Sequence, residues 1–136
     1  MTDICQAIYA YLSKNEQIRE RVGNKIFPIM LPEDAPLPAI VYSPEIANYE
    51  SALQGETGYV RQAEQCVCHD RTLKKARELS RLVKHAFQDF HGNMCGLEIQ
   101  AVFIKTDYEY NGNTALKFNT EEYLSSIEFE FYYNEK

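Results

Sequence analysis

The clearest pattern in this chain is the C-terminal stretch Ser126-Ile127-Glu128-Phe129-Glu130-Phe131-Tyr132-Tyr133, in which apolar and polar side chains alternate. Successive side chains of a β-strand point to opposite faces of the sheet, so a period of two indicates a strand. The face that begins with Ile127 is apolar enough to lie in a core. The other face, which we expect at the surface, carries Glu128, Glu130 and Tyr132.

A long amphipathic helix is predicted upstream of this strand. Thr72 is a suitable N-cap, and apolar residues recur at helical spacing from Leu73 to about Phe90. The helix should pack on a sheet with this apolar side. Its opposite side carries a row of cations, Lys74, Arg77, Arg81 and Lys84.

The N-terminal segment favours two shorter helices. Asp3 and Gln6 form a capping-box pattern, which begins a helix that should run to about Lys14. Asn15 can cap a second helix, and Gly23 can supply the positive φ that ends it.

Three further strands are indicated, at residues 39–43, 59–68 and 97–110. In the last of these, Leu97, Ile99, Ala101 and Phe103 alternate with polar residues and should share one face. Residues 44–58 and 111–122 are polar, and Asn111-Gly112 is a strong turn signal. Long loops of this kind are commonly functional or disordered until bound, so we expect mobile loops at both places.

These elements predict an α+β fold. We expect a single domain over residues 1-136 with the element order α-α-β-β-α-β-β. The sheet should be antiparallel, with about four strands, and the long helix and N-terminal helices should pack on one of its faces. A chain of 136 residues is long enough to bury a core without metal or disulfide support.

Charge and aromatic content restrict the function. The net charge of −6 argues against a general nucleic-acid-binding protein, which normally carries positive charge to replace phosphate counterions. Cations nevertheless crowd the long helix, and acidic residues crowd the C-terminal segment. Such opposite patches can pair between copies in a head-to-tail ring, although two solvated faces would give the same pattern. The ten tyrosines suit surfaces that become buried in an assembly, or they simply follow strand propensity.

The four cysteines predict neither a disulfide nor a metal site. Cys66 and Cys68 are two residues apart in a predicted strand, too distant for an easy bridge, and reduced thiols in the cytoplasm are expected. The sequence Cys66-x-Cys68-His69 lacks the spacing and the second ligand pair of a zinc site. Neither a nucleophile elbow nor a phosphate-binding loop occurs. We therefore expect no enzymatic activity and no cofactor.

No signal peptide or membrane association is expected either. The N-terminus is polar, and no apolar run approaches the ~20 residues of a membrane span.

The order of short motifs along the chain is more specific than its composition. Val22-Gly23 precedes Ile26-Phe27-Pro28; the segments Pro38-Ala39-Ile40-Val41-Tyr42, Leu53-x-Gly55 and Thr72-Leu73-Lys74-Lys75-Ala76 follow. This succession resembles the bacteriophage tail-completion and tail-terminator proteins. The chain departs from that pattern at Phe27, where the family has Tyr. It also has Cys66-Val67-Cys68-His69 where typical members carry Val, Asp and aromatic residues.

The resemblance implies a structural virion protein. Subunits of this family would form a hexameric ring on the head-proximal end of a tail, stop polymerisation of the tube and join the tail to the head connector. The partners would be further copies of the chain, the tail-tube protein and the head-completion or connector protein. DNA would only pass through the lumen. The protein would lie in the virion, and in the host cytoplasm during assembly.

The character of the sequence, as distinct from the resemblance, suggests where contacts lie. We expect loops 44–58 and 111–122 to change on docking and the sheet edges to form seams between subunits. The candidate interface residues are Tyr49, Leu53, Gly55, Gly58, Lys74, Arg77, Arg81, Lys84, Tyr108, Tyr110, Glu128, Glu130 and Tyr132. The alternative is a soluble α+β adaptor or small-ligand-binding domain without catalytic activity, for which an apolar pocket would be decisive.

Overall fold

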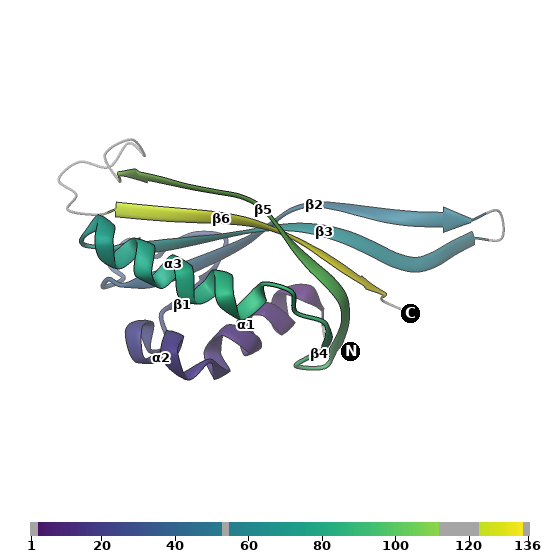
Figure 1. The fold of residues 1–136 in the computed structure, drawn as a ribbon, viewed down its shortest axis with the longest axis horizontal. Coiled ribbons are helices and arrows are strands. Elements are labelled where there is room, and N and C mark those ends of the chain that lie inside the picture. The colour runs from purple at the N-terminus through teal and green to yellow at the C-terminus, as the bar shows by residue number, and fades with distance from the viewer. Residues whose placement is uncertain (1–2, 53–54, 112–122, 135–136) are drawn as a thin grey trace.

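The computed structural model describes residues 3–52, 55–111 and 123–134. Within these residues, three helices and six strands follow one another (Figure 1). The helices are α1 (Ile4–Lys14), α2 (Glu16–Val22) and α3 (Leu73–Phe87). The strands are β1 (Ile26–Pro28), β2 (Ala39–Ala52), β3 (Gly55–Asp70), β4 (Gly92–Met94), β5 (Leu97–Asn111) and β6 (Tyr123–Asn134).

The six strands form one mixed sheet in the order β1-β2-β3-β6-β5-β4. The α+β class is confirmed, and the four predicted strands form the antiparallel centre of the sheet. The predicted strand number and purely antiparallel pairing were only roughly right, because β1 adds a parallel edge next to β2 and β4 adds an antiparallel edge next to β5. These two strands have three residues each, too few to show a period of two.

Residues 44–58 are not the predicted loop. Within the described residues, β2 continues to Ala52 and β3 begins at Gly55. Pairing between the two strands satisfies their backbone groups, so the segment forms a ladder despite its polar composition. The register shifts between Pro44 and Ala47, which marks a bulge where the sequence alternation is lost. The second predicted loop lies outside the described residues, apart from Asn111, the last residue of β5.

All three helices cover the same face of the sheet, as predicted (Figure 1). We call this the inner face and the opposite one the outer face. The core lies between them. On β3 the inner face carries Val60, Cys66 and Cys68, and on β6 it carries the predicted apolar residues that begin with Ile127. Because the cysteines are surrounded by apolar side chains, they act as small hydrophobic residues.

Phe87 joins three parts of the core. Its side chain is fully buried, and its ring centroid lies 5.2 Å from that of Tyr11 in α1, 5.1 Å from Phe129 and 5.4 Å from Phe131 in β6. The Tyr11 hydroxyl donates to the carbonyl of Ala86. Aromatic contacts of this kind add to the burial of apolar area, so they fix α3 and α1 on β6.

The predicted helix caps are confirmed. Asp3 and Gln6 form the capping box, and the Asn15 and Thr72 side chains accept from the backbone amides of Ile18 and Lys75. Gly23 ends α2 with a φ of 62°. Only the end of α3 differs: it lies at Phe87, three residues before the predicted Phe90.

Beyond the helical layer, β2 and β3 run on as a long hairpin arm (Figure 1). The pairing of β3 with β6 begins at Tyr59, so Gly55 and Glu56 pair with β2 alone. β1 covers the other edge of β2 only at residues 40–42. Within the described residues, therefore, most of this edge of β2 has no strand partner.

None of the described helices is long and apolar enough to cross a membrane.

Candidate assembly surfaces

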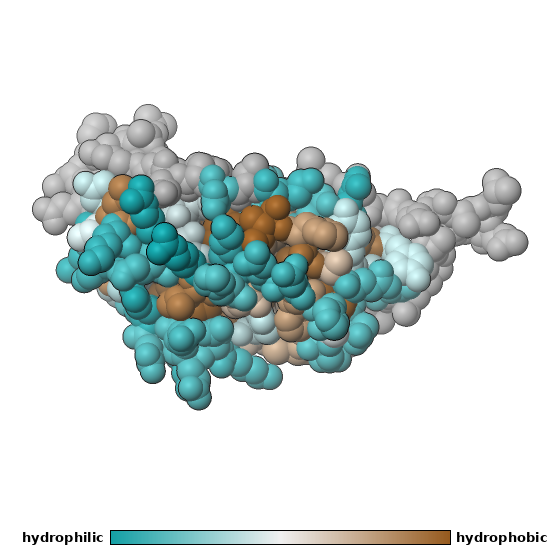
Figure 2. Space-filling model, in the orientation of Figure 1, coloured by the Kyte–Doolittle hydropathy of each residue, from teal (hydrophilic) through white to brown (hydrophobic). Residues whose placement is uncertain are grey.

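The predicted row of cations lies on the side of α3 that faces away from the sheet. Lys74, Arg77 and Arg81 are exposed, while Lys84 is partly buried and lies 3.5 Å from the carboxylate of Asp107 in β5. In the orientation of Figure 1, hydrophilic side chains cover most of α3 and α2 (Figure 2). We call Lys74, Arg77, Arg81 and Lys84 the cation face.

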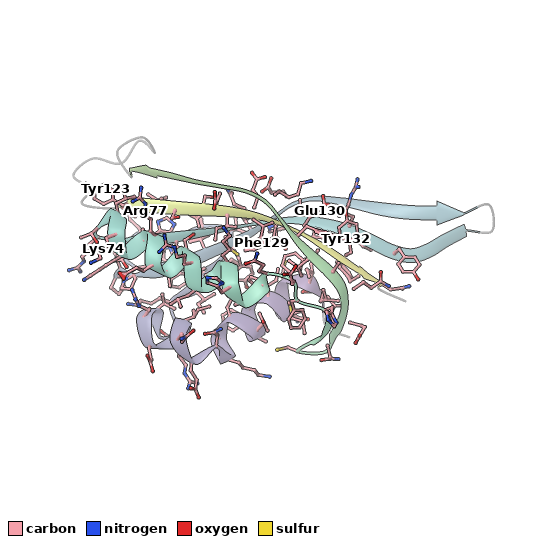
Figure 3. The ribbon with its side chains drawn as sticks, in the orientation of Figure 1. Lys74, Arg77, Tyr123, Phe129, Glu130 and Tyr132 are labelled. Atoms are coloured by element: carbon pink, nitrogen blue, oxygen red, sulfur yellow. The ribbon has the colours of Figure 1, made fainter. Side chains whose placement is uncertain are left out.

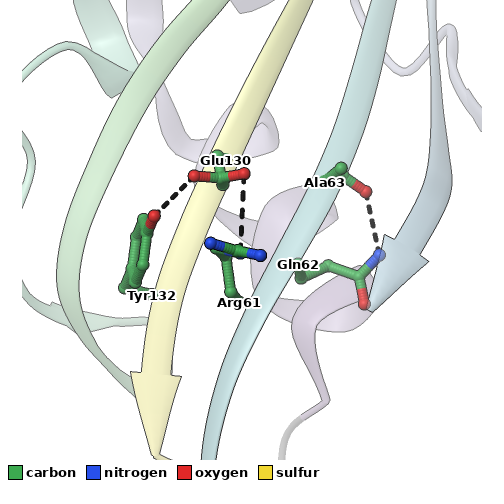
Figure 4. Close-up of polar contacts among 5 residues, drawn as sticks. All are labelled: Arg61, Gln62, Ala63, Glu130 and Tyr132. Carbon is green, nitrogen blue, oxygen red and sulfur yellow. Dashed lines mark hydrogen bonds and ion pairs between the residues drawn. The ribbon is translucent and has the colours of Figure 1, made fainter. Parts of the chain in front are cut away.

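The outer face of the sheet holds a polar cluster that spans β3 and β6 (Figure 4). The Tyr132 hydroxyl donates to Glu130 Oε1 at 2.6 Å, and Arg61 Nε lies 3.8 Å from Glu130 Oε2. The hydrogen bond to Glu130 raises the pKa of Tyr132 above its ordinary value. Because Arg61 is half exposed, its ion pair with Glu130 contributes about 0–1 kcal/mol at most.

Aromatic side chains extend this cluster. Phe103 in β5 meets Tyr132 edge to face at 5.4 Å between ring centroids, yet 55% of Phe103 is exposed. Tyr59 in β3 is 41% exposed. Large aromatic side chains left in solvent beside polar groups are typical of surfaces that contact a partner.

Two further carboxylates lie close together on this face. Burial and the nearby charge of Glu128 raise the pKa of Glu45, which lies at the bulge of β2. Among the residues that the structure describes, no cation lies within ion-pair distance of either carboxylate. The two like charges therefore repel each other in the isolated subunit. We call Glu45, Glu128, Glu130, Tyr132 and Phe103 the outer patch.

The cation face and the outer patch lie on different sides of the subunit. α3 packs on the inner face of β3 and β6, whereas Glu128, Glu130 and Tyr132 alternate with the core residues of β6 and point outward. Lys74 and Arg77 also lie toward one end of the molecule, whereas Glu130 and Tyr132 lie near its middle (Figure 3). This arrangement cannot produce contact between the patches within one subunit.

The family model described as tail completion protein gp17 matches residues 6–110, which is most of the chain. The chain belongs to this family. The resemblance suspected from the motifs is thus confirmed, and the coarse function is that of a structural protein of a phage tail and virion.

The fold also matches a chain of a solved assembly entitled "Virion of native gene transfer agent (GTA) particle", with a TM-score of 0.77. The match covers 96% of this chain and 94% of that chain at 10% sequence identity, so it shows a shared fold. No curated protein matches the sequence. A structural virion family gives no expectation of catalysis.

The other residues that were predicted to form interfaces lie on strands or outside the described residues. Tyr49 belongs to β2, Gly55 and Gly58 to β3, and Tyr108 and Tyr110 to β5; Leu53 lies outside the described residues. Their part in an interface stays a prediction.

Sequence reasoning missed Arg61 and Phe103. Phe103 was expected on the same face as Leu97 and Ile99, which lie in the core. The register of β5 against β6 shifts between Ile99 and Ala101, so Phe103 turns to the outer face. Nothing in the local sequence marks this bulge. Arg61 could have been predicted on the outer face, because it follows Val60 in the strand and neighbouring side chains point to opposite faces.

A shallow groove of about 270 Å³ lies at the other end of the outer face. Its lining includes Val41, Val67 and His69, together with Ile29 and Met30, which are 68% and 72% exposed. Cys66 and Cys68 point to the opposite, inner face. In the part of the chain that the structure describes, no three residues of the types His, Cys, Asp and Glu gather as a metal site would require.

Glu64 is the one charged side chain among the fully buried residues of the described core. It lies on the inner face of β3, where Cys5 Sγ is 4.0 Å from Oε1. Among the described residues, Oε2 has no hydrogen-bond partner. Burial, and secondarily the charge of Glu45, raises the pKa of Glu64 to about 8. Burial likewise raises the pKa of the neighbouring Tyr42 to about 12. The Glu64 carboxyl is therefore mostly protonated at neutral pH.

Proposed function

We propose that this protein forms a ring, with six subunits, on the head-proximal end of a phage tail. The ring ends polymerisation of the tube and joins the tail to the head connector. The observation that carries the proposal is membership of the tail completion family over residues 6–110. The partners are further copies of the chain, the tail-tube protein and the head-completion or connector protein, and DNA passes through the lumen.

Two features of the subunit suit such a ring. A closed ring of identical subunits needs two different contact surfaces on each copy. The cation face and the outer patch are two such surfaces, with opposite charge. No strand among the described residues pairs with the edge of β2 beyond Tyr42, so a neighbouring chain can bind this edge through main-chain hydrogen bonds.

The decisive experiment is electron microscopy of the purified protein mixed with tail-tube protein or unfinished tails. We expect rings on the tube ends and arrested tube growth, and the mass of the protein in solution shows whether rings form before docking. A protein that ignores tubes and stays monomeric would overturn the proposal. In that event the groove between Ile29 and Val67 would make a small-ligand-binding role the next one to test.

A further inference from the structure

We propose that the outer patch of one subunit binds the cation face of α3 in the next copy of this chain. The inference rests on the proposed ring and names the contact that closes it. The two surfaces lie on different sides of the subunit, so the contact is head to tail. Each copy then offers one surface to each neighbour, as a cyclic assembly requires.

The charges of the two surfaces are complementary. Glu45 and Glu128 are close enough for one to raise the pKa of the other, and neither has a cation partner among the described residues. Glu130 accepts a hydrogen bond from Tyr132, and its one cation partner among the described residues is the half-exposed Arg61. On α3, Lys74 and Arg81 are exposed, and no ion pair joins them to any described residue. Bringing the surfaces together would relieve repulsion on both sides.

The spacing of the charges also fits. Glu128 and Glu130 are two residues apart on a strand, which separates them by about 6–7 Å along β6. Arg77 and Arg81 are four residues apart on a helix, which separates them by about 6 Å along α3. A helix laid along the strand can therefore present successive cations to successive carboxylates.

The apolar part of the outer patch suits the same partner. Phe103 pairs in register with Glu130, and 55% of its side chain is exposed in the isolated subunit. Arginine and lysine carry aliphatic stems that pack on aromatic rings, and guanidinium groups stack on ring faces. A cationic helix can thus cover the aromatic side chains while its charged ends reach the carboxylates.

The test is a charge exchange between the surfaces. One variant carries Lys74→Glu with Arg81→Glu, a second carries Glu45→Lys with Glu128→Lys, and a third carries all four substitutions. Arg19→Glu and Glu33→Lys, which reverse exposed charges elsewhere, are the matched controls. Circular dichroism and thermal melting establish that each variant is folded. Ring formation is measured by light scattering in solution and by electron microscopy on tube ends.

We expect each two-residue variant to need at least about tenfold more protein for half-maximal assembly, because like charges then face each other across the seam. The four-residue variant should recover most of this loss, and the controls should match the wild type. If the folded two-residue variants assemble rings as readily as the wild type, this contact is overturned and the proposed function still stands. Failure of the wild type to form rings in either assay would overturn both.

Discussion

At the scale of single residues, the most unusual group is the buried carboxyl of Glu64. Ionisation would place an unpaired charge beside Cys5 and Tyr42, where none of the described residues donates a hydrogen bond to Oε2. The neutral form is therefore preferred, and the folded protein holds a proton that an unfolded chain releases near pH 4.5. The residue lies opposite Pro44, at the bulge of β2.

The first prediction concerns the pH dependence of stability. The folded pKa of Glu64 is raised, so the folded state binds more protons than the unfolded state between about pH 4.5 and about pH 8. The free energy of unfolding should therefore fall as pH rises through this window, by up to about 1.4 kcal/mol per pH unit from this group. Glu64→Gln removes the titration and should flatten the curve, as measured by urea unfolding at successive pH values.

The matched control for this measurement is Glu98→Gln, because Glu98 is exposed on β5. It should keep the pH dependence of the wild type. Parallel curves for the wild type and Glu64→Gln would show that Glu64 titrates at an ordinary pKa.

At the scale of elements, the stability of α3 depends on its N-cap, Thr72, and on the buried aromatic ring of Phe87. The Thr72 hydroxyl accepts from the amide of Lys75 at 3.1 Å, which satisfies one of the free amides at the start of the helix. This helix carries the cation face, so its first turn also positions Lys74.

The second prediction is that Thr72→Ala lowers the free energy of unfolding by about 1 kcal/mol, because the side-chain cap is lost. Thr72→Ser keeps the hydroxyl and should lose much less. Chemical denaturation of both variants makes the comparison, and equal losses would show that the hydroxyl does not stabilise the helix.

The third prediction concerns Phe87, which contacts both α1 and β6. Phe87→Ala should lower the free energy of unfolding by about 3–5 kcal/mol, because it removes a fully buried ring and leaves a cavity. Leu82→Ala is the control, since Leu82 is only partly buried at the edge of the core. Both variants are measured in the same denaturant series. If Phe87→Ala loses no more free energy of unfolding than Leu82→Ala, the central position of the Phe87 ring is contradicted.

At the scale of the whole molecule, the structure combines a compact body with a two-stranded arm. The body has a helical layer on the inner face of the sheet, whereas the arm extends past it (Figure 1). Isolated two-stranded ribbons are at most marginally stable in water. The arm should thus be the part of the described sheet whose stability depends most on contacts with other subunits.

The fourth prediction follows for hydrogen exchange. In the free subunit, amides of β2 beyond Ser43 should exchange faster than those of β3 at residues 60–68, which pair with β2 and β6 on both sides. In rings on tube ends, the β2 amides should become protected as neighbouring subunits cover this edge. Mass spectrometry measures the exchange in both states. If the β2 amides exchange equally fast in free subunits and in rings, this edge is not part of the contact between subunits.

Local pattern determined the three helices, the four central strands, and the core-facing sides of α3 and β6. The capping residues, the apolar stripe of α3 and the alternation in β6 depend on neighbours within a few positions, so periodicity and cap chemistry predicted them. The order of motifs likewise predicted the tail completion family, which the match over residues 6–110 confirms.

Only the tertiary structure decided the features that depend on distant pairing. The arm exists because residues 44–52 of β2 pair with residues 55–64 of β3, and a single-residue shift in register turns Phe103 outward. The short strands β1 and β4 form against neighbours supplied by the sheet. Burial of Glu64 and the placement of α3 cations and β6 carboxylates on different sides require two layers to meet. Such contacts join residues far apart in the chain, which local periodicity cannot report.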